Sequence, residues 1–203
     1  MIPAPIRSVC HWPKRHLPIS LIIGFCFISQ FTWLIFPELK ELLAFNHQAV
    51  ERGGWYRLIS GAMIHTNGYH LLMNVAGLVA ITLLFGKTVS SVRGFVAWLS
   101  ITVLSGLAIY LLVPEVKWFV GLSGSLHGLL AWAALTQLPK HLYSNIALLI
   151  GLTIKIVFEQ VTGGDTGTSE LIGARVLIEG HLMGALSGVV VAFVTQILVR
   201  LKK

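Results

Sequence analysis

A serine and a histidine that lie far apart in the sequence have the chemistry needed for nucleophilic catalysis. Ser123 lies between Gly121 and Gly124, and His181 precedes Gly184 by three residues. A serine hydroxyl is a weak nucleophile unless a base takes its proton, and histidine is the commonest base. The neighbouring glycines allow close backbone approach, and a helix start at Ser123 would direct N–H groups at an oxyanion. We predict Ser123 as the nucleophile and His181 as the general base.

Three further polar residues fit around this pair. His70 and Asn74 are four residues apart, so they share a helix face, and both can donate hydrogen bonds to an oxyanion. His127 follows Ser123 by four residues, and we expect it to support the site, either stacked on His181 or hydrogen-bonded in the core. Plainer interpretations stay open: Ser123 as a small packing residue, and the histidines and Asn74 as structural polar contacts.

A third group often orients the histidine of such a site, and a carboxylate is the usual choice. The eight acidic residues fall in segments that we place outside the membrane or at its outer boundary. Glu179 is the one nearest to His181 in sequence. We therefore expect a two-residue dyad, and Glu179 would be the candidate if a triad were present.

The composition predicts that membrane helices position these residues. The 203 residues are 55% hydrophobic and 11% charged, and the mean hydropathy is +0.80. About 20 apolar residues span a bilayer, and we expect an all-α bundle of six such helices. The first is predicted as a span and not as a cleavable signal peptide. The predicted spans cover residues 17–36, 69–86, 94–114, 118–139, 143–158 and 181–199.

We expect one membrane domain over residues 1–203, made of an N-terminal segment (1–16), a six-helix core (17–199) and a basic tail (200–203). With a cytoplasmic N-terminus, nine Lys and Arg residues lie inside and five outside, which the positive-inside rule favours. Both termini are then cytoplasmic. The net charge of +7 thus indicates orientation in the membrane, among lipids, and not binding of nucleic acid.

This topology brings the polar residues to one depth. The predicted second, fourth and sixth helices all begin at the outer face, where His70, Ser123 and His181 lie. Gly124, with Gly121, Gly128 and Ala131, gives the fourth helix a face of small residues, and Gly184 and Gly188 do the same for the sixth. Such faces let helix backbones approach closely.

Other parts of the chain have weaker signals. Residues 159–180 are predicted as an outer loop that serves either as a lid or as a plain connector. Lys155, the one charge inside a predicted span, is expected to extend to the outer boundary, although a role in the site stays open. No spacing indicates a metal or cofactor site, and the absence of charges along a pathway argues against a transporter.

Four motifs together resemble the rhomboid family of intramembrane serine proteases. They are Trp55-Tyr56-Arg57, His70-x-x-x-Asn74, Gly121-x-Ser123-Gly124 and His181-x-x-Gly184-x-x-x-Gly188. The resemblance implies a six-helix rhomboid-like bundle with Ser123 and His181 as the catalytic dyad. It also implies that His70, Asn74 and the Ser123 backbone N–H bind the oxyanion, and that Arg57 is a structural residue of the first loop.

A finer resemblance concerns the substrate. The family often has Tyr four residues after the serine, where this chain has His127. The runs 52–57 and 121–128 resemble the rhombosortase subgroup, which implies membrane-anchored substrates with a C-terminal Gly-Gly tail. It also implies a bacterial inner membrane with the site open to the periplasm. The alternative is a catalytically inactive rhomboid-like protein that binds or escorts membrane proteins.

Overall fold

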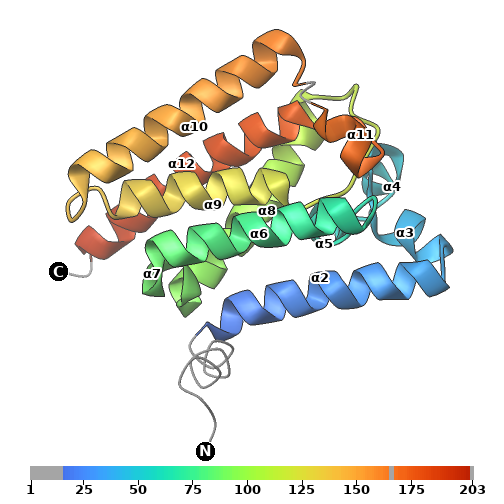
Figure 1. Cartoon of the computed structure of the whole chain (residues 1–203), viewed down its shortest axis with the longest axis horizontal. Helices are drawn as coiled ribbons and strands as arrows, with labels where there is room; N and C mark the ends of the chain where they lie inside the picture. Colours follow the sequence, from blue (N-terminus) through green and yellow to red (C-terminus); the bar gives the residue numbers. More distant parts are fainter. Residues whose placement is uncertain (1–15, 165–166, 202–203) are drawn as a thin grey trace, which may run out of the picture.

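The computed structural model describes residues 16–164 and 167–201, and Figure 1 shows long helices packed side by side. Most of the predicted N-terminal segment, residues 1–15, and the end of the basic tail, residues 202–203, lie outside the described residues. The prediction of a single domain over the whole chain stays a prediction.

Five helices of the described part are long and apolar enough to cross a membrane. Each has at least 18 residues, which corresponds to about 27 Å or more at 1.5 Å per residue. Large apolar side chains on these helices face outward, as expected for surfaces in contact with lipid. The five are α2 (Leu17–Ile35), α6 (Gly68–Phe85), α8 (Val92–Leu112), α10 (Leu142–Thr162) and α12 (Ile178–Leu201).

The predicted fourth span differs from the structure. Residues 118–139 were expected to be one helix, but α9 (Ser123–Thr136) has 14 residues, about 21 Å. Its predicted first turn is extended, because Trp118 and Phe119 form the strand β2 (Trp118–Phe119) and Gly121 has a φ of +118°. The helix therefore begins at Ser123, and a count of six full-length spans is not confirmed.

The boundaries of the last two long helices also correct the sequence prediction. α10 continues to Thr162 and α12 begins at Ile178, so residues 159–180 are not one loop. The short helix α11 (Thr168–Ile172) lies between them. Glu159, predicted at the membrane boundary, is therefore a residue of the long helix α10.

Short elements between α2 and α9 build one end of the bundle. They are α3 (Glu38–Leu43), β1 (Phe45–Asn46), α4 (His47–Glu51), α5 (Arg57–Met63) and β2, with α7 (Lys87–Ser90) at the other end. β1 and β2 pair antiparallel, with Phe45 opposite Phe119. The Gly121 N–H donates to the Gly61 carbonyl at 2.9 Å, which fixes the chain just before α9.

The most enclosed element is α9, which packs against α12, α8, α6 and α10. Its core residues Leu129, Trp132 and Ala133 are fully buried. The crossing with α12 depends on glycine: a Cβ added at Gly184 would lie 1.9 Å from the Gly124 carbonyl oxygen, and one at Gly188 would lie 2.1 Å from that of Gly128. The predicted small-residue faces thus meet each other.

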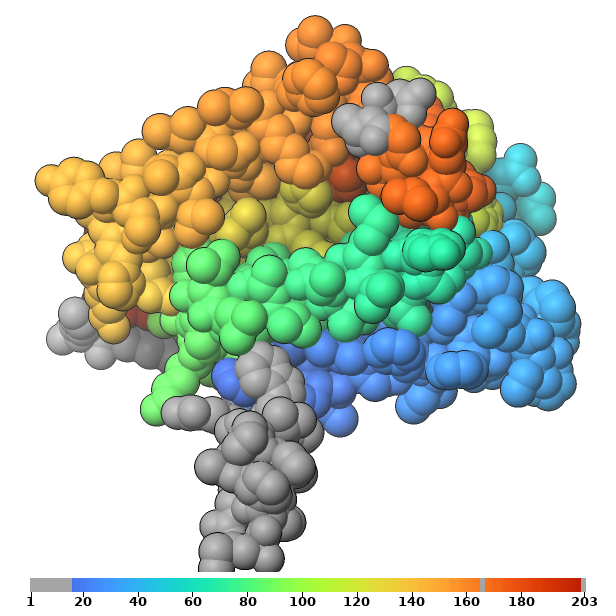
Figure 2. Space-filling model, in the orientation of Figure 1, coloured from blue at the N-terminus to red at the C-terminus, as the bar shows by residue number. Residues whose placement is uncertain are grey.

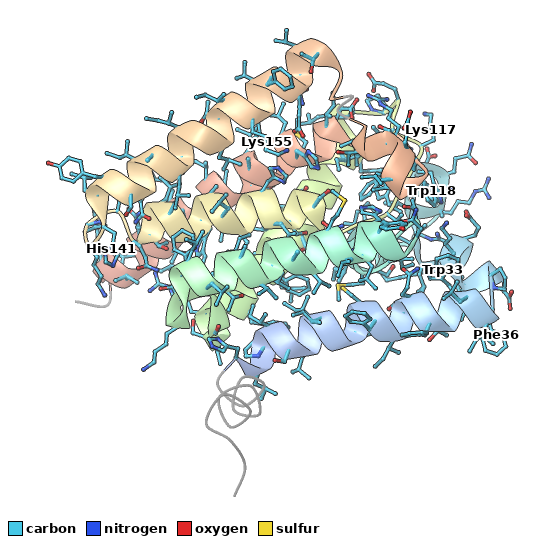
Figure 3. All side chains as sticks on the ribbon, viewed as in Figure 1. Trp33, Phe36, Lys117, Trp118, His141 and Lys155 are labelled. Atoms are coloured by element: carbon cyan, nitrogen blue, oxygen red, sulfur yellow. The ribbon has the colours of Figure 1, made fainter. Side chains whose placement is uncertain are left out.

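The directions of the first and last long helices, α2 and α12, determine at which end of the bundle the described chain begins and ends. α2 begins and α12 ends at the same end of the bundle, opposite the end at which α9 begins (Figure 1). Trp33 and Trp118 lie at the Ser123 end, whereas His141 lies at the other end (Figure 3).

Candidate active site

The site is built around the first residue of α9. Ser123 is half-buried, and the preceding segment is held by β-pairing and by the Gly121–Gly61 hydrogen bond. The first N–H groups of a helix have no partner within the helix, and the helix dipole adds positive potential there. The fold therefore places the Ser123 hydroxyl beside backbone donors.

His181 approaches Ser123 from the first turn of α12. Its Nε2 lies 3.0 Å from the Ser123 Oγ, which is hydrogen-bond distance. The two residues are 58 positions apart in the sequence, and the glycine contacts of α9 with α12 hold their helices this close. The imidazole is 6% exposed, so its orientation is fixed by protein contacts.

A carboxylate completes the environment of His181, and the sequence analysis missed it. The Oε2 of Glu159 lies 2.8 Å from His181 Nδ1. Glu179, the candidate nearest in sequence, instead forms an ion pair with Arg175. The carboxylate that contacts His181 is therefore Glu159 and not Glu179, because α10 extends one turn further than predicted and carries Glu159 alongside α12.

Lys155 extends toward the outer end of α10, as predicted, and there has a specific partner. It lies one turn before Glu159 on α10, and its Nζ forms an ion pair with Glu159 Oε1 (Lys155 in Figure 3). Two residues of opposite charge that are four positions apart on a helix can form an ion pair, and this spacing was the sequence signal for Lys155 and Glu159. Treating Glu159 as a loop residue hid it.

His127 packs against one face of the His181 imidazole. Its ring stacks on that of His181, with centroids 4.1 Å apart and planes 16° apart. Its Nδ1 lies 2.7 Å from the Ser123 carbonyl oxygen, so this nitrogen donates a hydrogen bond within α9. Both contacts that the sequence suggested as alternatives are present together. The stacking restricts rotation of the His181 ring.

His70 and Asn74 border Gly121, next to Ser123. A Cβ added at Gly121 would lie 2.6 Å from His70 Nε2 and 3.7 Å from Asn74 Nδ2. Thr66 contacts the other ring nitrogen of His70 through its backbone N at 3.4 Å and its Oγ1 at 3.0 Å. The Asn74 amide donates one hydrogen to the His70 carbonyl at 3.2 Å and keeps a second. A glycine at position 121 leaves space between these groups and Ser123.

A buried histidine that was not predicted as a site residue lies next to His70. His65, in the connection between α5 and α6, is fully buried, and its ring meets that of His70 edge-on with centroids 5.0 Å apart. Burial, with a smaller contribution from His70, lowers the pKa of His65 from 6.5 to about 3. His65 is therefore neutral at ordinary pH.

Arg57 lies away from the reacting groups. Its Nη1 donates to the carbonyl oxygens of Glu41 and Ala44, both at 2.7 Å, and the side chain is 9% exposed. It thereby fastens α5 to the chain segment that leads into β1. Ser125, two residues after Ser123, hydrogen-bonds Thr102 at 2.8 Å in the core.

Ser123 lines two cavities. A cavity of about 20 Å³ lies on the α8 side, lined by Ser105, Gly106 and Gly124 among others. A cleft of about 260 Å³ lies on the other side, lined by His70, Trp118 and neighbouring residues. The smaller has room for about one water molecule. Ser123 therefore borders a small cavity on its α8 side and a larger cleft on the other side.

The surface is also hollowed at the side of the bundle. The space-filling view shows a depression between α10 (orange) and α6 (green), with atoms of α9 (yellow) at its bottom (Figure 2). α6 carries His70 and Asn74, and α10 carries Glu159. The two helices that flank this depression thus both supply residues of the site.

A metal ion does not suit the donor geometry at this place. Ligand atoms of His127, Glu159 and His181 lie within 4.8 Å of one another. However, imidazole lone pairs lie in the ring planes, and the two rings are stacked, so their nitrogens are directed side by side and do not converge on one point. The predicted absence of a metal and of any cofactor stays a prediction.

The sequence profile of the Rhomboid domain matches residues 52–197, more than half of the chain. The chain belongs to the rhomboid family. This match includes each residue predicted for the site, from Arg57 to Gly184. A search of curated proteins found no match. The rhomboid family comprises multi-pass membrane proteins and intramembrane proteases that act on membrane proteins, although some members are inactive.

Proposed function

We propose that this rhomboid is an active intramembrane serine endopeptidase, with Ser123 as nucleophile and His181 as general base. The observation that carries the proposal is the 3.0 Å contact between Ser123 Oγ and His181 Nε2 at the start of a helix. An inactive rhomboid-like binding or escort protein has no need of this contact. The same chain also keeps a pair of donors, His70 and Asn74, at the adjacent Gly121.

In the proposed reaction His181 Nε2 takes the proton of Ser123 as Oγ bonds to the substrate carbonyl carbon. The carbonyl oxygen becomes an oxyanion, stabilised by the Ser123 backbone N–H, Asn74 Nδ2 and His70 Nε2. His70 donates in the tautomer whose Nδ1 accepts from the Thr66 backbone N–H. The C–N bond then breaks, and the leaving amine takes the proton from His181.

A water molecule completes the cycle. His181 Nε2 takes a proton from this water as its oxygen bonds to the acyl carbon. The bond between the acyl carbon and Ser123 Oγ then breaks, Oγ takes the proton back from His181, and the carboxylic acid is released. The cleft of about 260 Å³ beside Ser123 supplies a route for water from the end of the bundle. The depression between α6 and α10 supplies a lateral route for a membrane-anchored substrate (Figure 2).

The small cavity beside Ser123 favours substrates with small residues at the cleaved bond. At about 20 Å³ it accepts no large side chain without rearrangement. Glycine also destabilises a helix by roughly 1 kcal/mol relative to alanine, which helps a substrate helix to unwind before cleavage. Both arguments support a Gly-Gly segment followed by a membrane helix, the substrate class of rhombosortases.

We infer the orientation in the membrane from the tryptophans at the Ser123 end of the bundle and from the distribution of Lys and Arg residues. Lys40 Nζ lies 4.8 Å from the Trp33 ring and 5.7 Å from that of Trp118, at the Ser123 end of the bundle. Tryptophans of this kind are enriched at membrane interfaces. With the more basic end inside, both termini are cytoplasmic and Ser123 faces the outer side, which is the periplasm for a bacterial inner membrane.

A matched set of substrates tests the proposal. The purified protein in lipid vesicles is given a membrane-anchored reporter with Gly-Gly before its helix, and the same reporter with Ala-Ala or Leu-Leu there. We expect cleavage of the Gly-Gly reporter, weaker cleavage with Ala-Ala, little with Leu-Leu, and none by Ser123→Ala. Equal cleavage of all three would refute the preference for glycine, and binding without any cleavage would favour the inactive alternative.

A further inference from the structure

The Glu159 carboxylate, the His181 imidazole and the Ser123 hydroxyl are joined by two successive hydrogen bonds. His181 bonds Ser123 through Nε2 at 3.0 Å and Glu159 through Nδ1 at 2.8 Å. A carboxylate is an acceptor, so Nδ1 must carry the hydrogen in this contact. In a neutral imidazole Nε2 is then free of a proton and able to take that of Ser123. The contact therefore selects the tautomer that a general base requires.

Neighbouring groups hold the carboxylate in place. Its second oxygen pairs with Lys155, whose side chain is 48% exposed, while the Glu159 side chain is 11% exposed. Gln160, the next residue, donates to the Ile178 carbonyl at 3.0 Å and so joins α10 to the start of α12. Leu152 and Ile156 of α10 pack against Ala131 and Ala185. This end of α10 is thus fixed to both helices of the site.

We propose that Glu159 is a positioning residue that turns the predicted dyad into a Ser123–His181–Glu159 triad. This inference rests on the proposed function. The carboxylate holds His181 in the tautomer with Nδ1–H and stabilises the imidazolium that forms when the Ser123 proton moves to Nε2. Lys155 balances the carboxylate charge, and stacked His127 restricts the ring from its face.

The contribution of α10 has a consequence for substrate entry. α10 flanks the depression through which we expect a substrate to enter (Figure 2). Because Glu159 comes from this helix, movement of α10 away from α12 separates the carboxylate from His181. Full activity therefore requires α10 to be packed against α12 when the bond is cleaved.

Substitutions at two carboxylates separate this role from a general effect of charge. Glu159→Gln keeps the shape but weakens the acceptor, Glu159→Asp keeps the charge, and Glu179→Gln removes a carboxylate that pairs with Arg175. The readouts are kcat and KM on the Gly-Gly reporter, the rate of fluorophosphonate labelling of Ser123, and the melting temperature. Wild type and Ser123→Ala are measured in parallel.

We expect Glu159→Gln to lower kcat by roughly 10⁴-fold with little change in KM, as for loss of the acid in other serine hydrolases. Glu159→Asp should recover part of this loss, and Glu179→Gln should match wild type. A kcat for Glu159→Gln within about threefold of wild type, less than 1 kcal/mol of barrier, would refute the triad. If wild type is itself inactive and unlabelled, the proposed function fails instead.

A measurement without substitution covers the case in which Glu159→Gln does not fold. Nitrogen-15 NMR of histidine in the wild-type protein identifies which ring nitrogen carries the proton. We expect the Nδ1–H tautomer for His181. The Nε2–H tautomer would contradict the proposal, whatever the variants do.

Discussion

The crossing of α9 and α12 gives a quantitative prediction for Gly184→Ala. The added Cβ would lie 1.9 Å from the Gly124 carbonyl oxygen, whereas ordinary contact begins at 3.4 Å. The obstructing atoms are backbone atoms of a buried helix, so no side chain can move aside. Restoring contact requires a local shift of about 1.5 Å between the helices that carry Ser123 and His181.

This shift is large compared with the hydrogen bond that it affects. The Ser123–His181 contact is 3.0 Å, and an interaction beyond about 3.5 Å no longer acts as a hydrogen bond. A misplacement of about 1 Å in an active site lowers the rate by roughly 10²-fold. Overpacking also destabilises a well-packed interior by about 1–3 kcal/mol. Gly184→Ala should therefore lose activity more severely than it loses stability.

Gly151→Ala is the matched control. Gly151 lies on α10, and nothing would lie within 4 Å of its added Cβ. The assay compares kcat on the Gly-Gly reporter and the melting temperature for both variants in the same lipid. We expect Gly151→Ala to equal or slightly exceed wild type in stability, because alanine favours helix more than glycine does. If Gly184→Ala is as active as Gly151→Ala, the helix crossing does not set the catalytic distance.

Three further predictions concern residues around the site. Arg57→Ala should destabilise the protein by about 1–3 kcal/mol because the buried Ala44 carbonyl oxygen and the partly buried Glu41 carbonyl oxygen lose their donor, measured as a lower melting temperature. His70→Ala and Asn74→Ala should each lower kcat by up to about 10²–10³-fold while Ser123 stays reactive toward fluorophosphonate, and unchanged kcat in both would exclude an oxyanion role. Since the pKa of His65 is lowered to about 3, the unfolded chain binds the extra proton below pH 6.5, so stability should fall by about 2 kcal/mol from pH 7 to pH 5. His65→Leu should remove that part of the pH dependence, and an unchanged pH profile would contradict it.

Local patterns in the sequence predicted much of the candidate site. Five of the six predicted spans correspond to long helices, and glycine spacing predicted that α9 and α12 pack closely. The pattern of Ser123 and His181 was readable because each lies at the start of a helix, where motif spacing and helix direction determine depth. The same reasoning gave His127, since residues four apart share a helix face.

The acid partner was not readable from the sequence. Glu159 follows an apolar run, and a charged residue in that position reads as the end of a membrane helix. Its place depends on α10 continuing to Thr162 and on the angle at which α10 packs against α12. Both are tertiary features, as is the β1–β2 pairing that shortens α9. Hydropathy carries no information on these three features.

The most direct test of the central claim is the reactivity of Ser123. A serine-directed fluorophosphonate is added to wild type, Ser123→Ala and His181→Ala in lipid, and the labelled peptide is identified by mass spectrometry. We predict that wild type is labelled at Ser123, that Ser123→Ala is not labelled, and that His181→Ala is labelled far more slowly. Labelling of wild type at another residue, or equal labelling of His181→Ala, would contradict activation of Ser123 by His181.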